Sequence, residues 1–152
     1  MLHEEVGDIV LGNYPIICQQ VNCKGVMGSG LAKQIRTKYP EAYNSYTYFI
    51  KQCKEFDEPL LGSVNKVILH DGRILFNMFA QDGYGRDKRY TDYTAFEHCL
   101  EENRLLVPEN KTIAIPYLIG CGLGGGDWYI IKGMLEDFSN IIKNKVIIVA
   151  LK

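Results

Sequence analysis

Two glycine-rich segments are the parts of this chain whose residue types suggest chemistry. The first is VNCKGVMGSGLAKQ, residues 21–34, and the second is IPYLIGCGLGGGDW, residues 115–128. Glycine lets backbone N–H groups approach a ligand closely, and a helix that begins at such a loop adds unpaired donors and a partial positive charge. Each segment is a candidate site for phosphate oxygens, and two together suit a diphosphate. The alternative is that the glycines only permit sharp turns.

The second segment contains a formal G-x-G-x-x-G motif from Gly120 to Gly125. A dinucleotide-binding fold also needs an acidic residue about 20 positions further on, at the end of the next strand. That strand ends here in Ala150-Leu151-Lys152, without an acid. Neither segment contains the Gly-Lys-Ser/Thr of a Walker A loop. The motifs therefore argue against a nicotinamide dehydrogenase and against a nucleoside triphosphatase.

The elements around these segments predict an α/β fold. Apolar runs that precede the glycine segments indicate buried strands, and apolar residues at helical spacing follow both. We expect Ser29 and Thr91 to cap helices, Pro40 to end one helix or begin the next, and Asp71-Gly72 to form a hairpin turn. The expected strands are 15–21, 63–69, 73–80, 112–118 and 145–151, and the expected helices begin near 29, 40, 91 and 128. This order predicts a three-layer α/β/α domain with a mixed, mostly parallel central sheet.

Composition limits the class of protein. The 152 residues are 47% hydrophobic and 23% charged, which suits a single domain over 1–152. A formal net charge of −1 predicts no general affinity for nucleic acid. The acidic N-terminus and the lack of an apolar run of about 20 residues predict a cytoplasmic protein with no membrane partner. Five cysteines without a C-x-x-C pair predict free, mostly buried thiols and no metal site.

Three stretches together resemble a macrodomain, the ADP-ribose-binding α/β module. Val6 to Val10 resembles the Gly-Asp-Ile strand end of that family, Val21 to Gly30 its first ligand loop, and Ile119 to Trp128 its second. The sequences of Met27 to Ala32 and of Ile119 to Leu123 are similar to those of the macrodomain branch that contains terminal ADP-ribose glycohydrolases and phosphatases of ADP-ribose-1''-phosphate. The resemblance implies a macrodomain fold over nearly the whole chain.

The resemblance also implies ligand-binding roles. Asp8 would accept a hydrogen bond from the adenine amino group, with the backbone of Ile9 beside it, and Asn22 would contact the distal ribose. The residues themselves leave alternatives, because Asp8 suits a turn or cap and Asn22 suits a structural amide. The two loops would wrap the diphosphate and the distal ribose through Val26, Met27, Gly28, Ser29, Gly30, Leu31, Ile119, Gly120, Cys121, Gly122, Leu123 and Gly124.

For catalysis, the resemblance implies two positions that differ from the branch. In its glycohydrolases a lysine after the central strand attacks the ribose and an acid in the second loop completes the reaction, and the equivalents here are Gln81 and Gly124. We predict Asp127, Gln81 and Asn22 as catalytic residues, with Asp127 orienting or deprotonating water. The alternative for Asp127 is the N-cap of the following helix. The polar segment from Gln81 to Tyr90 suits a lid over a charged ligand, and the alternative is an ordinary solvated loop.

Two functions remain open at this stage. One is a metal-independent hydrolase without a cofactor, which either dephosphorylates ADP-ribose-1''-phosphate or removes ADP-ribose from a protein or nucleic acid. The other is a non-catalytic reader that binds ADP-ribose through the same pocket. In both, the partner is ADP-ribose or an ADP-ribosylated macromolecule.

Overall fold

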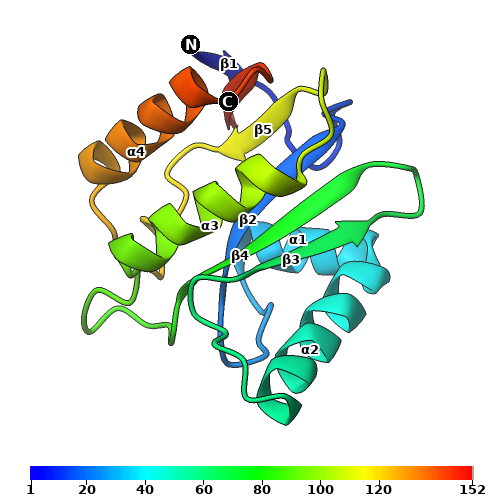
Figure 1. Ribbon diagram of the computed structural model, residues 1–152, viewed down its shortest axis with the longest axis vertical. Coiled ribbons are helices and arrows are strands. Elements are labelled where there is room, and N and C mark those ends of the chain that lie inside the picture. Colours follow the sequence, from blue (N-terminus) through cyan, green and yellow to red (C-terminus); the bar gives the residue numbers. More distant parts are fainter. Residues whose placement is uncertain (152) are drawn as a thin grey trace.

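The computed structural model describes residues 1–151 and contains a six-stranded sheet with the strand order β1-β6-β5-β2-β4-β3 (Figure 1). Only the β3–β4 pair is antiparallel, and the other neighbouring pairs are parallel. The predicted mixed, mostly parallel sheet is therefore confirmed. The strands are β1 (Leu2–Val6), β2 (Ile16–Asn22), β3 (Val64–Ile68), β4 (Ile74–Gln81), β5 (Ile113–Pro116) and β6 (Val146–Ala150).

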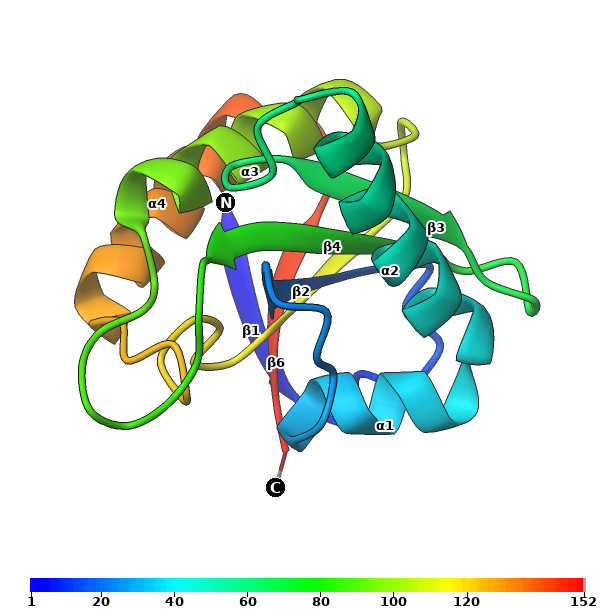
Figure 2. The ribbon, with the colours of Figure 1, turned by 90° about the horizontal axis from the view of Figure 1, so that it is seen from below.

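Helices cover both faces of the sheet, as the three-layer prediction requires (Figure 2). The helices α1 (Gly30–Lys38) and α2 (Pro40–Glu55) lie on one face, and α3 (Tyr93–Leu106) and α4 (Trp128–Ile141) lie on the other. Alternate residues of β2 face opposite layers, so Ile17 packs in the cluster with Ile35 of α1 while Cys18 packs in the cluster with Phe96 of α3. This alternation is the period-two pattern of a strand buried on both faces.

Local sequence signals explain several element boundaries. Pro40 occupies the first turn of α2, where its missing N–H costs nothing. The Asp71-Gly72 turn joins β3 to β4 with Gly72 at φ +90°. The predicted cap at Thr91 is wrong by one residue, because the side chain of Asp92 accepts the Ala95 N–H and caps α3. Thr91 instead makes a bridge with Gln81 at the end of β4.

Two strands differ from the sequence prediction. β1 precedes the predicted Val6 to Val10 strand end, and most of its residues are exposed at the edge of the sheet, so it carries no buried apolar run. β5 ends at Pro116 rather than at 118, because the Ile119 N–H donates to the Pro116 carbonyl and closes a turn there. No helix within residues 1–151 is long and apolar enough to cross a membrane.

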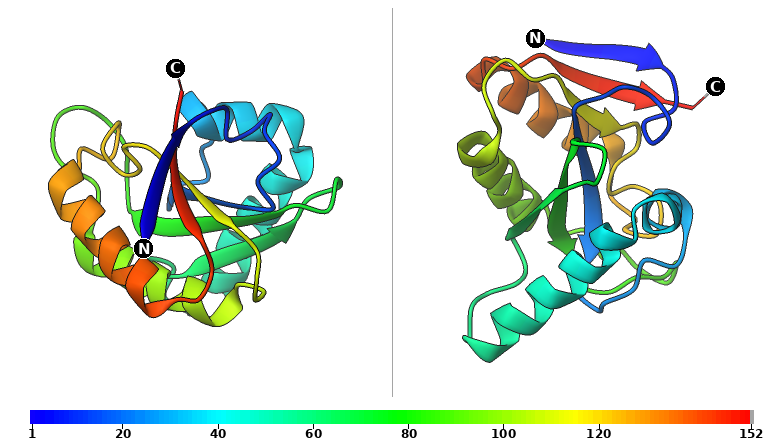
Figure 3. Two further views of the ribbon diagram at one scale, coloured as in Figure 1. Left: turned by 90° about the horizontal axis from the view of Figure 1, so that it is seen from above. Right: turned by 90° about the vertical axis from the view of Figure 1, so that its right-hand side faces the viewer.

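The two glycine loops leave neighbouring strands in opposite directions. β2 leads through the first loop to α1 and onward to β3 and β4, while β5 leads through the second loop to α4 and back to β6 (Figure 3). The strand order thus reverses between β2 and β5. In open α/β sheets, ligands bind outside the carboxyl ends of the strands at such a switch point.

Candidate functional site

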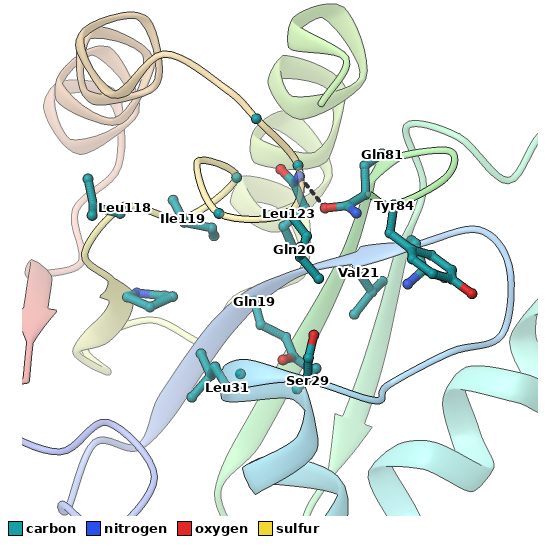
Figure 4. Close-up of a pocket in the computed structure, with 18 of the residues that line it drawn as sticks. Gln19, Gln20, Val21, Ser29, Leu31, Gln81, Tyr84, Leu118, Ile119 and Leu123 are labelled. Atoms are coloured by element: carbon teal, nitrogen blue, oxygen red, sulfur yellow. Dashed lines mark hydrogen bonds between the residues drawn. The ribbon is translucent and has the colours of Figure 1, made fainter. Parts of the chain in front are cut away.

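A cavity of about 960 Å³ opens at the carboxyl ends of β2, β4 and β5, between the two glycine loops (Figure 4). Both loops and the segment after β4 contribute to its wall. Of the residues predicted from the sequence, those that line it are Asn22, Val26, Gly28, Ser29, Gly30, Leu31, Gln81, Ile119, Gly120, Gly122, Leu123 and Gly124. Asp8, Ile9, Met27, Cys121 and Asp127 are not part of the wall. The switch point therefore brings most of the predicted ligand residues together.

Asn22 lines the cavity and also holds the first loop in shape. Its Nδ2 donates to the Val26 carbonyl at 2.8 Å, and its Oδ1 accepts the Lys24 N–H at 2.9 Å. The buried Tyr46 hydroxyl donates to the backbone carbonyl of Asn22 at 2.6 Å. The structural role considered for this amide is thus present, and a ligand would meet an amide whose orientation is fixed in advance.

The N-terminus of α1 forms part of the cavity wall and has no side-chain cap. Ser29 stands at the N-cap position with an extended backbone, but its side chain makes no capping bond, and the first turn contains no acidic residue. By contrast, Asp92 caps α3 and Asp127 caps α4. The first N–H groups of a helix have no partners within the helix. Those of α1 are therefore free to bind an anion in the cavity.

The second loop is folded tightly against Thr91, which explains part of its glycine content. A Cβ atom at Gly124 would lie 2.3 Å from the Thr91 hydroxyl and 2.7 Å from the Gly120 carbonyl. Gly120 has φ +76°, a conformation that other residues rarely adopt. Packing therefore requires glycine at position 124, and the backbone conformation requires it at position 120. Position 124 has no room for the acidic residue of the glycohydrolase branch that the sequence resembles.

A partly buried network of polar side chains links residues of the cavity wall beneath that loop. Gln20 Nε2 donates to Gln81 Oε1 and to the Thr91 hydroxyl, both at 2.8 Å, and Thr91 donates to the Gly120 carbonyl at 2.7 Å. Gln81 Nε2 in turn donates to the Gly83 carbonyl at 2.9 Å. Sequence reasoning missed Gln20 and Thr91, although a polar Gln19-Gln20 pair inside an apolar strand is an unusual feature that points to such a network.

The segment 82–90, which the sequence suggests as a lid and which we call the lid segment, is attached to both glycine loops. At one end, the Asp82 carbonyl accepts the Cys23 N–H; at the other, Tyr90 and Thr91 N–H both donate to the Gly124 carbonyl. The Tyr90 ring packs beside Gly83, where a Cβ would lie 3.0 Å from it. Three lid side chains with cationic or aromatic character line the cavity: Tyr84, Arg86 and Lys88.

The two predicted carboxylates lie outside the cavity wall and each has a local structural role. Asp8 Oδ1 accepts the N–H groups of Val10 and Leu11, both at 2.9 Å, in the turn after β1. Asp127 Oδ1 accepts the Tyr129 N–H at the start of α4. The turn and cap roles that the sequence left open are thus the ones that the side chains perform here.

The cysteines of the loops are poorly suited to act as nucleophiles. Burial raises the pKa of the Cys23 thiol to about 12, with a further contribution from Asp82. Burial likewise raises the pKa of Cys121, again with a nearby aspartate, Asp127. The thiolate is the reactive form, and both thiols are protonated at neutral pH. Residues 1–151 contain no group of three or more His, Cys, Asp or Glu side chains placed to hold a metal ion.

Comparison with known proteins gives sequence relatives. An uncharacterized 17.5 kDa protein of the tk-vs intergenic region of phage T4 is 31% identical over 142 residues, covering 88% of this chain and 84% of that protein. A DNA ADP-ribosyl transferase-DNA ADP-ribosyl glycohydrolase fusion protein of Thermosipho africanus is 30% identical over 145 residues, covering 85% of this chain. The match spans 36% of that fusion protein. No protein-family model matches the sequence.

Solved structures show the same fold. The macrodomain of Mycobacterium tuberculosis DarG superposes with a TM-score of 0.82 at 23% identity, covering 99% of this chain and 97% of that one. Thermosipho africanus DarTG in complex with ADP-ribose superposes with a TM-score of 0.74 at 19% identity, covering 99% of this chain and 42% of that one. At these identities the likeness establishes the fold alone.

Proposed function

We propose that this chain, a macrodomain that belongs to the same family as the phage T4 protein, binds ADP-ribose in the cavity between its glycine loops. The observation that carries the proposal is the uncapped N-terminus of α1, which presents free N–H donors to a cavity whose opposite wall is the second glycine loop. Such donors select an anion. A cavity of about 960 Å³ is also large enough for a ligand of this size.

The two ends of the cavity differ in chemistry, which gives the ligand a direction. Leu31 and Leu118 lie at one side of the cavity, and Gln81 and Tyr84 lie at the opposite side (Figure 4). With the diphosphate between the loops, the apolar side suits the adenine ring and the polar side suits the distal ribose. Asp8 follows β1, on the side of the sheet nearer to β5 than to β4, which is consistent with its predicted contact to the adenine amino group.

We assign the reaction, if the bound ADP-ribosyl group is released, to hydrolysis at the polar end. Water would bond to the anomeric carbon, the bond from that carbon to the macromolecule would break, and the proton from water would pass to the leaving group. Similarity to the Thermosipho protein supports hydrolysis, since that protein is a fusion that includes a DNA ADP-ribosyl glycohydrolase. Arg86 and Lys88 bring positive charge to the wall, where it stabilises an anionic leaving group. The same charge suits release of phosphate from ADP-ribose-1''-phosphate.

A second candidate is a reader that binds ADP-ribose without turnover. The specific observation in its favour is that no Asp, Glu or His within residues 1–151 lines the cavity. Side chains of Asn22 and Gln81 can orient a water molecule, but an amide is not a general base. Turnover through this cavity therefore requires a carboxylate such as Asp127 to approach, or a reaction that proceeds with oriented water alone.

A turnover panel separates these functions. The substrates are ADP-ribose-1''-phosphate, O-acetyl-ADP-ribose, acyl-linked ADP-ribose on protein and ADP-ribosylated DNA, each followed by release of ADP-ribose or phosphate. We expect release from at least one, and loss of that release in Gln81→Leu. Release that survives Asp127→Ala undiminished would refute the catalytic role of Asp127. Binding of ADP-ribose without any release would establish the reader.

A further inference from the structure

The turn after β5 holds a leucine in a backbone conformation that normally belongs to glycine. Ile119 N–H donates to the Pro116 carbonyl at 3.1 Å, which closes a four-residue turn whose third residue is Leu118. Leu118 has φ +63°. A side chain in this left-handed region is strained, and turns that need a positive φ at the third position usually place glycine or asparagine there.

The other described residues with a positive φ are all of types that tolerate this conformation. The next turn, closed by Cys121 N–H on the Leu118 carbonyl, has Gly120 at its third position with φ +76°. Elsewhere within residues 1–151, the other non-glycine residues with positive φ are Asp57 and Asn110, with φ +53° and +64°. Asp and Asn tolerate this region because their short polar side chains bond locally. Leucine has no such compensation.

The backbone strain at Leu118 is not offset by packing of its side chain in the core. It is 42% exposed and belongs to none of the apolar clusters formed by the described residues, whereas Ile119 beside it is 5% exposed and packs in one of them. Instead, Leu118 lines the cavity at its apolar side, with Leu31 (Figure 4). Backbone strain that no packing contact offsets is characteristic of binding sites.

We propose that Leu118 is a specificity residue, held in a strained turn so that its side chain packs against the adenine ring of the ligand. The inference rests on the proposed binding of ADP-ribose and adds to it the group that recognises the base. A flat apolar ring is the ligand part that gains most from an aliphatic side chain, because burial of both surfaces removes apolar area from water. Ribose and diphosphate carry no such surface.

Substitution of Leu118 tests this by its separate effects on thermal stability, which should not fall, and on the affinity for ADP-ribose, which should. Leu118→Gly and Leu118→Asn relieve the strained φ, so the midpoint of thermal unfolding should stay equal to that of the wild type or rise by up to about 4 °C. Both variants remove the apolar contact, so the affinity for ADP-ribose should fall about tenfold by calorimetry. Asn110→Gly, in a turn outside the cavity wall, is the control and should leave the affinity unchanged.

A ligand without a base identifies the group that Leu118 contacts. Affinity for ribose 5-phosphate should be the same in the wild type and in both Leu118 variants. An equal loss for ADP-ribose and ribose 5-phosphate would show a distorted loop and overturn the inference, as would unchanged affinity for ADP-ribose or a lower unfolding midpoint. If the wild-type chain itself fails to bind ADP-ribose, the proposed function falls first and the inference with it.

Discussion

Gln20 Nε2 lies 2.8 Å from Gln81 Oε1, so a strand that sequence reasoning treated as core fixes the orientation of the amide predicted to act on the ligand. The same Nε2 bonds to Thr91, which bonds to the second glycine loop at Gly120. Residues from β2, the end of β4, the segment 82–90 and the second glycine loop are thereby joined beneath the cavity. This network therefore helps to fix the shape of the cavity wall.

Removal of the Thr91 hydroxyl should destabilise the fold. Thr91→Val keeps the shape of the side chain but removes two hydrogen bonds, so Gln20 Nε2 keeps only Gln81 as an acceptor and the Gly120 carbonyl keeps only the Gly126 N–H as a donor. A hydrogen bond within the protein contributes about 0.5–1.5 kcal/mol, so the loss of both bonds should lower the free energy of unfolding in urea by about 1–3 kcal/mol. Thr94→Val, at an exposed position of α3, is the matched control and should change it by less than about 0.5 kcal/mol. Equal stabilities of the two variants would contradict the network.

The glycines of the second loop should differ in their tolerance of a methyl group. Gly124→Ala places a Cβ 2.3 Å from the Thr91 hydroxyl, while Gly122 has nothing within 4 Å of the same position. Overpacking of this kind costs about 1–3 kcal/mol or more, so Gly124→Ala should lower the unfolding free energy by about 3 kcal/mol. Gly122→Ala should be close to neutral in the same urea titration. Similar stabilities would mean that the loop moves freely away from Thr91.

A negative charge at the N-terminus of α1 should raise the stability of the chain but lower its affinity for ADP-ribose. Ser29→Asp supplies the missing cap and a favourable interaction with the helix dipole, which together stabilise the chain by about 0.5–1 kcal/mol. The same carboxylate occupies the anion site and repels a diphosphate, so we expect ADP-ribose affinity to fall at least about tenfold. Ser29→Asn caps the helix without the charge and should weaken binding much less. Equal affinities of the Asp and Asn variants would show that no anion binds there.

Acid should weaken the contact between α2 and the β3–β4 turn. Glu41 accepts the His70 N–H at 2.7 Å and contacts the His70 ring at 2.6 Å. Burial alone would raise the pKa of Glu41, but the His70 backbone and side-chain bonds outweigh it, so the pKa lies below its ordinary value.

A carboxylate whose pKa is lowered by folding contributes stability that is present above its unfolded pKa and is lost as pH falls through the folded one. The thermal midpoint of the wild type should therefore drop more than that of Glu41→Gln between pH 7 and pH 3. At pH 7 the variant should be the less stable of the two. Parallel pH profiles would show that the His70 contact does not form in solution.

The fold was largely predictable because its signals are local. The Asp71-Gly72 turn, Pro40 at the start of α2 and the apolar strand β2 each identify an element within a few residues. The sequence did not predict β1 because an exposed edge strand needs no apolar pattern. Its pairing with β6 joins segments near the two ends of the chain. Such pairing depends on residues that local sequence does not connect.

The site was predictable in outline and less so in detail. Two glycine segments after strands place the cavity, since the carboxyl ends of parallel strands meet at one edge. The partners of Gln20 are 61 and 71 residues away, so no spacing rule reveals them. Leu118 was predicted to continue a strand, and only the backbone angle reveals its strained turn. The ligand contacts of Asp8 and Asn22 and the catalytic role of Asp127 remain predictions.

Calorimetric titration of ADP-ribose into the wild-type chain measures directly whether the cavity binds this ligand. We expect saturable binding of one ADP-ribose per chain with a dissociation constant on the order of micromolar, which corresponds to a binding free energy of about −8 kcal/mol. No saturable heat at millimolar ADP-ribose would contradict it.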